Sequence, residues 1–276
     1  MLMRFLIGLL FVVAACNFTV AQSAQSSAKS STEPSAHLSN FQAIEFRRYT
    51  IKEGERENFA KYFESYFPEA MEQTGAIAAG SFFERKQQNG FTWIRCFHTI
   101  EARAVANAAF YYGPVWREHR TALNDLMTDS DNVMLLRPLT PEQGVTILPA
   151  VDPVTESTGA EGIVVAQIFA VKANSVEAFA KAAEATFASY RAAGAREAGV
   201  LVTLDVANNF PQLPVRTDGP YLVWLGILKD NHMLETEFTP LVERSLQSFP
   251  ATGLLRGTPE LVVLDPTHRS RLRWLP

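Results

Sequence analysis

The hydrophobic residues between positions 41 and 139 change their spacing several times, and each change marks an expected element. Residues 55–73 repeat apolar side chains every three or four positions, which is typical of one helix face, and Gly75 stands where that helix would end. Asn89-Gly90 separates two apolar segments and predicts a hairpin. The pattern predicts strand Phe41–Ile51, helix Glu55–Gln73, strands Ala76–Arg85 and Phe91–Ile100, helix Ala102–Met127 with a break at Gly113-Pro114, and strand Val133–Leu139.

The pattern of residues 162–266 predicts the same order of elements a second time. Asn174 is expected to cap the first helix of this half, and Gly194 to end it. The predicted elements are strand Gly162–Val171, helix Ser175–Ala193, strands Ala195–Val206 and Tyr221–Lys229, helix Asn231–Gln247 and strand Glu260–Asp265. The order strand, helix, strand, strand, helix, strand is that of the ferredoxin-like unit.

Short segments of the two halves also match in sequence. Glu57-Asn-Phe-Ala-Lys61 returns as Glu177-Ala-Phe-Ala-Lys181, 120 positions later, and Phe67 matches Phe187 at the same offset. Residues 133–138 match residues 261–266 at an offset of 128. One supersecondary unit is therefore used twice along the chain.

The duplication suggests how the two sheets are covered. An antiparallel sheet with helices on one face leaves its other apolar face exposed, and two such sheets can cover each other. We therefore expect an α+β fold in which two tandem ferredoxin-like βαββαβ units form an intramolecular dimeric α+β barrel. The units are assigned to residues 41–139 and 162–266, with a proline-containing linker at 140–161 and a C-terminal tail at 267–276.

The N-terminus has the pattern of a targeting segment. Residues 1–15 carry Arg4 as their one charge, followed by an apolar run that is short for a membrane span. The run ends in Val13-Ala-Ala-Cys16, which resembles the lipobox of bacterial lipoproteins and makes Cys16 the expected lipidation site. An ordinary signal peptide cut after Thr19-Val-Ala21 is the alternative. Both predict an exported protein of the periplasm or cell envelope, and the first adds a lipid anchor to the membrane.

The composition argues against nucleic-acid binding, an intramolecular disulfide and a metal site. Residues 16–40 are rich in Ser and Ala and predict a flexible tether. From residue 16 onward the chain holds 24 Lys and Arg against 29 Asp and Glu, a net charge of −5, which argues against nucleic-acid binding. Cys96 is the one cysteine beyond the signal, so no intramolecular disulfide can form. No cluster of His, Cys and carboxylates has metal spacing, and no metal is expected.

Several residues of the first half resemble the NIPSNAP family. The segment Glu45-Phe-Arg-Arg-Tyr-Thr-Ile-Lys-Glu-Gly54 resembles the opening strand and turn of NIPSNAP domains. The similarity continues in order through Pro68, Gly75, Gly80-Ser-Phe82, Trp93 and Gly113-Pro-Val-Trp116. It implies the fold of the dimeric α+β barrel group, which includes monooxygenases and haem-degrading enzymes. For NIPSNAP proteins themselves it implies no agreed reaction.

The predicted strands 41–51 and 91–100 carry charged and aromatic residues at every second position. Because side chains alternate across a strand, these residues share one face of the sheet. We expect this face to line the barrel interior, while Ile94, Cys96 and Ile100 pack under the helices. The candidates for a ligand pocket are Glu45, Arg47, Tyr49, Trp93, Arg95 and Phe97, with Trp224 at the matched position of the second half. A mixture of charged and aromatic side chains is typical of small-molecule sites.

The same charges also allow a structural interpretation, in which Glu45 pairs with Arg47 or Arg95 and closes a polar gap between the sheets. The long connection Asn208–Pro220 in the second half can cover a pocket or be a tolerated surface insertion. Both alternatives stay open at the level of sequence.

A histidine on the second helix raises the question of haem. Haem-degrading members of the wider group use a helix histidine as iron ligand, which makes His119 the candidate for that role. A solvated histidine in Arg117-Glu-His-Arg120 is the alternative. The expected set of cofactors is therefore none, with haem as the exception.

Three functions fit the sequence. The first is an envelope-associated protein that binds a small apolar or aromatic ligand in the barrel between its halves. The second is an oxidative enzyme, either metal-independent or linked to haem. The third is a non-catalytic scaffold that assembles into oligomers through its outer helices. The sequence does not decide whether the protein is an enzyme.

Overall fold

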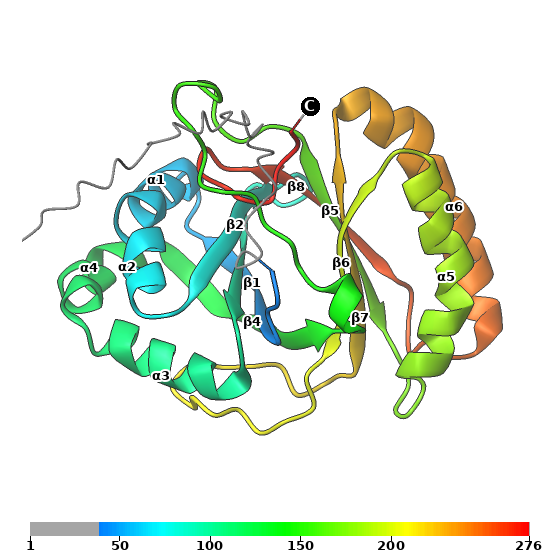
Figure 1. Cartoon of the computed structure of the whole chain (residues 1–276), viewed down its shortest axis with the longest axis horizontal. Coiled ribbons are helices and arrows are strands. Elements are labelled where there is room, and N and C mark those ends of the chain that lie inside the picture. Colours follow the sequence, from blue (N-terminus) through cyan, green and yellow to red (C-terminus); the bar gives the residue numbers. More distant parts are fainter. Residues whose placement is uncertain (1–38, 276) are drawn as a thin grey trace, which may run out of the picture. The chain divides into compact units, whose positions relative to one another are not determined.

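Each half of the chain forms four antiparallel strands that are covered by helices on one face (Figure 1). The computed structural model describes residues 39–275, so the predicted signal peptide, Cys16 and most of the tether lie outside the described residues. In the first half the elements are β1 (Ala43–Ile51), α1 (Arg56–Tyr66), α2 (Pro68–Gln73), β2 (Ile77–Glu84), β3 (Gly90–Phe97), α3 (Ile100–Tyr111), α4 (Pro114–Asn124) and β4 (Met127–Pro138).

The second half repeats this order after a 3₁₀ turn, η2 (Pro141–Gln143). Its elements are β5 (Ile163–Ala170), α5 (Val176–Ala192), β6 (Arg196–Thr203), β7 (Tyr221–Leu228), the π-helical segment η3 (Met233–Phe238), α6 (Thr239–Ser248), the 3₁₀ turn η4 (Phe249–Thr252) and β8 (Glu260–Pro266). Both predicted ferredoxin-like units are therefore present.

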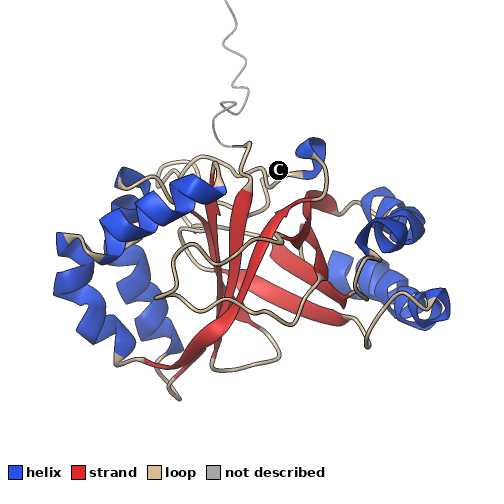
Figure 2. Ribbon diagram, turned by 90° about the horizontal axis from the view of Figure 1, so that it is seen from below, coloured by secondary structure: helices blue, strands red, loops and turns tan. Residues whose placement is uncertain are grey.

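The strands of the two halves close into one barrel in the order β1-β3-β2-β8-β5-β7-β6-β4. Two antiparallel seams join the halves. At one seam Phe83 of β2 lies opposite Asp265 of β8, and at the other Arg137 of β4 lies opposite Val202 of β6. Helices lie outside the barrel on both sides, with the strands between them (Figure 2). The predicted intramolecular dimeric α+β barrel is confirmed.

Several element boundaries differ from the sequence prediction for identifiable reasons. The predicted helix 55–73 breaks at Pro68, which begins α2. Ile100 starts α3 rather than ending β3, because the Thr99 hydroxyl accepts a hydrogen bond from the Ala102 amide at 3.1 Å and caps the helix. Asn174 does not cap α5. It has a φ of +59°, and Ser175 occupies the N-cap position.

The interior of the barrel is an apolar core built by both halves. Ile44 and Phe46 of β1 and Ile94 and Cys96 of β3 belong to it, and all four are fully buried. Valine, leucine and isoleucine side chains of the second half complete the same cluster. An eight-stranded barrel has an interior that side chains can fill. The predicted ligand pocket between the two halves is therefore wrong, because buried apolar side chains occupy that space.

The face assignment of β1 and β3 is wrong for the same reason. Glu45, Arg47, Trp93 and Arg95 point toward the helices, whereas Ile94 and Cys96 point into the barrel. Facing sheets lie about 10 Å apart, which suits short aliphatic side chains. The long arginine and indole side chains instead extend into the deeper layer beneath the helices.

The segments after β4 and β8 also contribute to the barrel core. Val145 and Ile147, from the predicted linker, and Leu272, from the predicted tail, are fully buried in the same apolar cluster. The Leu272 amide donates a hydrogen bond to the Ala79 carbonyl at 3.0 Å, and the Trp274 amide donates one to Glu161 at 2.8 Å. These two segments therefore pack against the strands as parts of the core.

Candidate functional site

A single carboxylate holds three arginines beneath the helices of the first half. Glu45 Oε2 accepts hydrogen bonds from Arg47 Nη1 at 2.8 Å and from Arg95 Nη2 at 2.6 Å. Glu45 Oε1 accepts one from Arg103 Nε at 2.6 Å. Each of these side chains is at most 2% exposed. We call Glu45, Arg47, Arg95 and Arg103 the Glu45 cluster.

The fold brings the cluster together from three elements. Glu45 on β1 lies directly opposite Arg95 on β3, and Arg47 lies opposite Trp93. Residues directly opposite on antiparallel strands have side chains close enough to interact. Arg103 comes from α3, one turn after the Thr99 cap, and reaches down to the sheet. Sheet and helix are thereby joined through charged groups.

Aromatic rings surround the guanidinium groups. The Cζ atoms of Arg47 and Arg95 lie 5.4 and 5.2 Å from the Trp93 ring. Arg95 also lies 5.3 Å from the ring of Phe97, and Arg47 Nε donates a hydrogen bond to the Tyr49 hydroxyl at 2.8 Å. Six of the predicted pocket residues are therefore neighbours, although they lie under the helices.

The arginine charges and burial together determine whether Glu45 and the neighbouring Tyr49 are ionised. Burial alone would raise the pKa of Glu45, but the positive charges of Arg95 and its two companions lower this pKa far below its usual range. Glu45 is therefore ionised at neutral pH. Burial raises the pKa of Tyr49, despite the opposing effect of Arg47, and keeps its phenol neutral.

Several polar groups next to the cluster make no hydrogen bond within the described chain. They are Nη2 of Arg103, both side-chain atoms of Asn107, and the indole Nε1 of Trp93, all of them buried. Arg103 and Asn107 are four residues apart and lie on the same buried face of α3. Buried polar groups are paired in most proteins, so unpaired ones need an explanation.

A loop of the second half covers this region. Arg103 Nη1 donates hydrogen bonds to Oδ1 of Asn208 at 3.1 Å and to Oδ1 of Asn209 at 2.7 Å. The ring of Phe210 stacks on Tyr111 of α3 at a centroid distance of 5.9 Å. Figure 1 shows the loop, in yellow, passing beside α3. The long segment 208–220 therefore acts as a cover for the first half.

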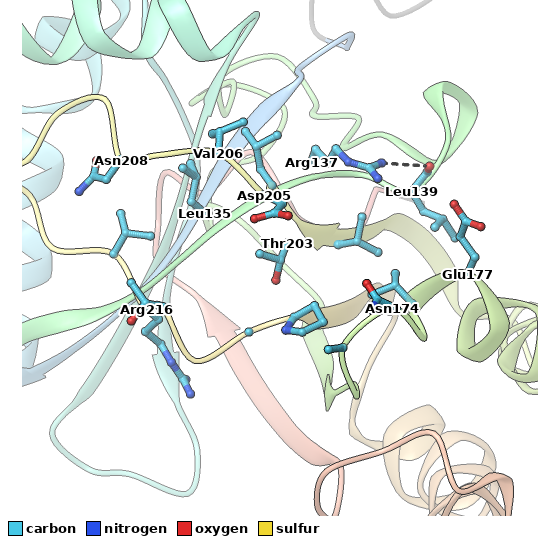
Figure 3. A pocket seen from close by; sticks show the side chains of 18 residues that line it. Leu135, Arg137, Leu139, Asn174, Glu177, Thr203, Asp205, Val206, Asn208 and Arg216 are labelled. Carbon is cyan, nitrogen blue, oxygen red and sulfur yellow. Dashed lines mark hydrogen bonds between the residues drawn. The ribbon is translucent and has the colours of Figure 1, made fainter.

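On its other side the same loop borders a cavity of about 800 Å³. The lining side chains come from β4, β6, the start of α5 and the loop itself, and they include Arg137, Asp205, Asn208 and Arg216 (Figure 3). Asn208 thus belongs both to the wall of the cavity and to the hydrogen-bond partners of Arg103. The cavity and the buried cluster therefore adjoin at Asn208.

The second-half positions that match Glu45, Arg47 and Arg95 hold the uncharged residues Val165, Gln167 and Gly226. Gln167 and Tyr190 share a hydrogen bond of 2.9 Å, and both contact the hydroxyl of Ser245. The indole Nε1 of Trp224 donates to Glu197 at 2.9 Å, whereas the matched Trp93 has no such partner. Trp224 therefore packs in the separate core of the second half and does not join the predicted pocket.

Sequence reasoning missed Arg103, Asn107 and the loop asparagines. Arg103 and Asn107 share the inward face of α3 with Ala106 and Phe110. Two polar residues at a spacing of four within an apolar helix stripe were the available signal. No comparable signal links Asn208 and Asn209 to α3, because loop docking depends on tertiary contacts.

His119 lies apart from the cluster, on α4. Its Nδ1 lies 2.8 Å from the Tyr62 hydroxyl, and its ring stacks on Tyr66 at a centroid distance of 3.8 Å. His119 is not among the residues that line the cavity of about 800 Å³ beside β4 and β6. These residues fit a contact between α1 and α4 better than a haem ligand, and haem ligation stays a prediction without support from this packing.

Cys96 is buried in the barrel, and burial raises the pKa of its thiol well above the usual range. Its predicted role as a packing residue is confirmed, although on the opposite face of β3. Within residues 39–275, no group of three or more His, Cys, Asp or Glu side chains is placed to ligate a metal. Each helix in that same range is too short or too polar to cross a bilayer.

Residues 44–141 match the NIPSNAP family. This match covers the first half, and the second half has the same order of elements. A NIPSNAP family protein of unknown function from Agrobacterium tumefaciens is 22% identical over 37% of this chain and 94% of its own, with a TM-score of 0.34. Comparison with proteins of curated function gives no match.

Longer structural matches span both halves. An anthrone oxidase-like protein is 13% identical over 85% of this chain and 97% of its own, with a TM-score of 0.54. A protein from Lactobacillus acidophilus, provisionally named a monooxygenase, is 13% identical over 84% of this chain and 97% of its own, with a TM-score of 0.51. A haem-binding protein from Thermus thermophilus is a weaker match, with a TM-score of 0.45. At these identities the similarity shows the fold alone.

Proposed function

We propose that this protein binds a small organic molecule beneath the helices of its first half, next to the Glu45 cluster. The observation that carries the proposal is the group of buried, unpaired polar atoms on Asn107, Arg103 and Trp93. The second half has the same architecture, yet its matched Trp224 is paired. The unpaired groups are therefore not a requirement of the fold, and binding a ligand would satisfy them.

Aromatic and apolar surface around the cluster favours a ligand with an apolar or aromatic body. Trp93, Phe97 and Tyr111 lie within about 6 Å of the Arg95 guanidinium carbon, and stacked or edge contacts between rings are favourable at such distances. The predicted ligand class is therefore kept, and its place moves from the barrel interior to the layer between sheet and helices.

Binding fits the residues of the Glu45 cluster better than catalysis does. A general base must be free to take a proton and must have a pKa near the working pH. Glu45 is fully engaged by three arginines, and its pKa is held far below that range. The likeness to oxidase-like structures supplies the fold and no catalytic residue. An assembly role has less support, since Val105 is the one large exposed apolar side chain on α3 among the described residues, and the exposed Tyr112 that follows α3 is already hydrogen-bonded to Gln212.

The proposal is tested by titrating the folded protein with small aromatic probes: benzoate, phenylacetate, benzamide and phenylacetamide. Isothermal calorimetry and intrinsic tryptophan fluorescence report the binding. We expect at least one probe to bind, and Asn107→Leu to weaken it about tenfold or more, because leucine fills space and offers no hydrogen bond. Tyr190→Phe, an equally buried change in the second half, serves as control and should leave the affinity unchanged.

Two outcomes contradict the proposal. One is that no probe binds the wild-type protein at millimolar concentration. The other is that Asn107→Leu and the wild type bind equally well, which would place the ligand elsewhere on the molecule.

We also propose that the protein is exported and anchored to the membrane of the cell envelope by a lipid on Cys16. Support comes from the Val13-Ala-Ala-Cys16 segment and the apolar run before it. Expressed in a bacterium that processes lipoproteins, the wild type should fractionate with membranes, and Cys16→Ala should become soluble. A wild-type protein that is soluble and begins at Gln22 would favour cleavage by the ordinary signal peptidase instead.

A further inference from the structure

The Glu45 cluster carries more positive than negative charge. Three arginines face one glutamate, which leaves a net charge of +2 on groups that are at most 2% exposed. The ion pairs of these arginines within the described residues all go to Glu45. Taking an unpaired charge out of water costs several kcal/mol. The cluster is therefore electrostatically incomplete.

No second carboxylate among residues 39–275 is paired with these three arginines. An arginine side chain does not lose its proton in proteins. The nearby phenol of Tyr49 is kept neutral by its raised pKa, so it supplies no negative charge. Asn208 and Asn209 offer Arg103 neutral amide oxygens, which accept hydrogen bonds without balancing the charge. A bound anion is what would balance it.

The unpaired groups have the polarity that an anion needs. Arg103 Nη2, Asn107 Nδ2 and Trp93 Nε1 are hydrogen-bond donors, and Asn107 Oδ1 is the one acceptor among them. Arginine binds carboxylates and phosphates through parallel N–H bonds, and bonds to ionised groups are about twice as strong as neutral ones. An anion bound at Arg103 and Asn107, which share a buried face of α3, would therefore balance the charge and accept from the free donors of these two residues.

We propose that the ligand of the Glu45 cluster is an organic anion whose carboxylate, or a similar oxyanion, is bound by Arg103 and Asn107. This inference rests on the proposed function and narrows it to one chemical class. The aromatic side chains of Trp93 and Tyr111 then contact the body of the ligand. Asn208 and Asn209 form the gate, because the ligand reaches Arg103 from the adjoining cavity by replacing their amide oxygens.

The test compares each carboxylate with its neutral amide of nearly the same shape: benzoate with benzamide, and phenylacetate with phenylacetamide. Affinities are measured by calorimetry in one low-salt zwitterionic buffer, and thermal shifts are recorded in parallel, with inorganic phosphate as a bare oxyanion. We expect the carboxylates to bind about tenfold or more tightly than the amides. Arg103→Gln should reduce this preference to less than about threefold.

Arg191→Gln is the matched control, since it removes an arginine whose ion pairs with Glu184 and Glu197 both lie in the second half. It should keep the full preference for carboxylates. Amides that bind as tightly as carboxylates would overturn the anion inference and leave the small-molecule function standing. Absence of binding by both kinds of probe, together with no thermal shift from phosphate, would overturn both. A preference that survives in Arg103→Gln would also contradict the assignment.

Discussion

Replacing Glu45 with glutamine should lower the free energy of unfolding by about 3–5 kcal/mol at pH 7, the range for removing one partner of a buried ion pair. The substitution keeps the shape of the side chain but leaves three buried guanidinium groups without their shared carboxylate. Urea denaturation followed by circular dichroism measures the effect. Glu184→Gln, which breaks an exposed ion pair with Arg191, should change the free energy by less than about 1 kcal/mol.

The destabilisation should also depend on pH with a defined sign. The pKa of Glu45 is lower in the folded protein than in the unfolded chain, where a glutamate titrates near about 4.3. Its stabilisation is therefore complete above that pH and is lost as the pH falls below it. The difference between wild type and Glu45→Gln should shrink below about pH 4. A difference that stays constant from pH 7 to pH 3 would contradict the assigned ionisation.

Replacing Leu272 with alanine should lower the free energy of unfolding by about 2–5 kcal/mol, as observed for buried leucines in general. Leu272 follows the last strand, yet it is fully buried in the barrel core, and its amide is bonded to β2. The change removes apolar contacts and leaves a cavity where two halves meet. Thermal and urea unfolding of the purified variant provide the measurement.

Val154→Ala is the control for Leu272→Ala, since Val154 is 85% exposed and its truncation should cost less than about 0.5 kcal/mol. If both variants were as stable as the wild type, residues 267–275 would be a dispensable tail, as their position in the sequence suggests. A large loss for Leu272→Ala alone would confirm that the segment completes the barrel.

The order of elements could be predicted because local signals agree with the fold. Gly75 and Gly194 have φ angles of +94° and end their helices as expected, and the Gly113-Pro114 break separates α3 from α4. The internal repeat then predicts two units of the same fold. Because each unit leaves one apolar face of its sheet uncovered, the two sheets are expected to pack against each other. These inferences depend on nearest neighbours along the chain and on general packing rules.

The orientation of β1 and β3 could not be predicted in the same way. Alternation divides their residues into two sets, but both sets are buried, so hydrophobicity does not say which one faces the helices. The partner that decides the matter is Arg103, which meets Glu45 only after α3 folds back over the sheet. The polar side chains of β1 and α3 must be considered together to decide which face of β1 and β3 lies under the helices.

Loop 208–220 of the second half, which covers α3 of the first, shows how the two copies of the repeat have become different. The first copy holds the charged residues, and the second supplies the asparagines that accept hydrogen bonds from Arg103, so the site contains residues of both copies. In a barrel made of two identical subunits, every buried charge occurs twice. Fusion into one polypeptide allows the costly arrangement to exist once, while the matched positions of the other copy, Val165, Gln167 and Gly226, stay uncharged.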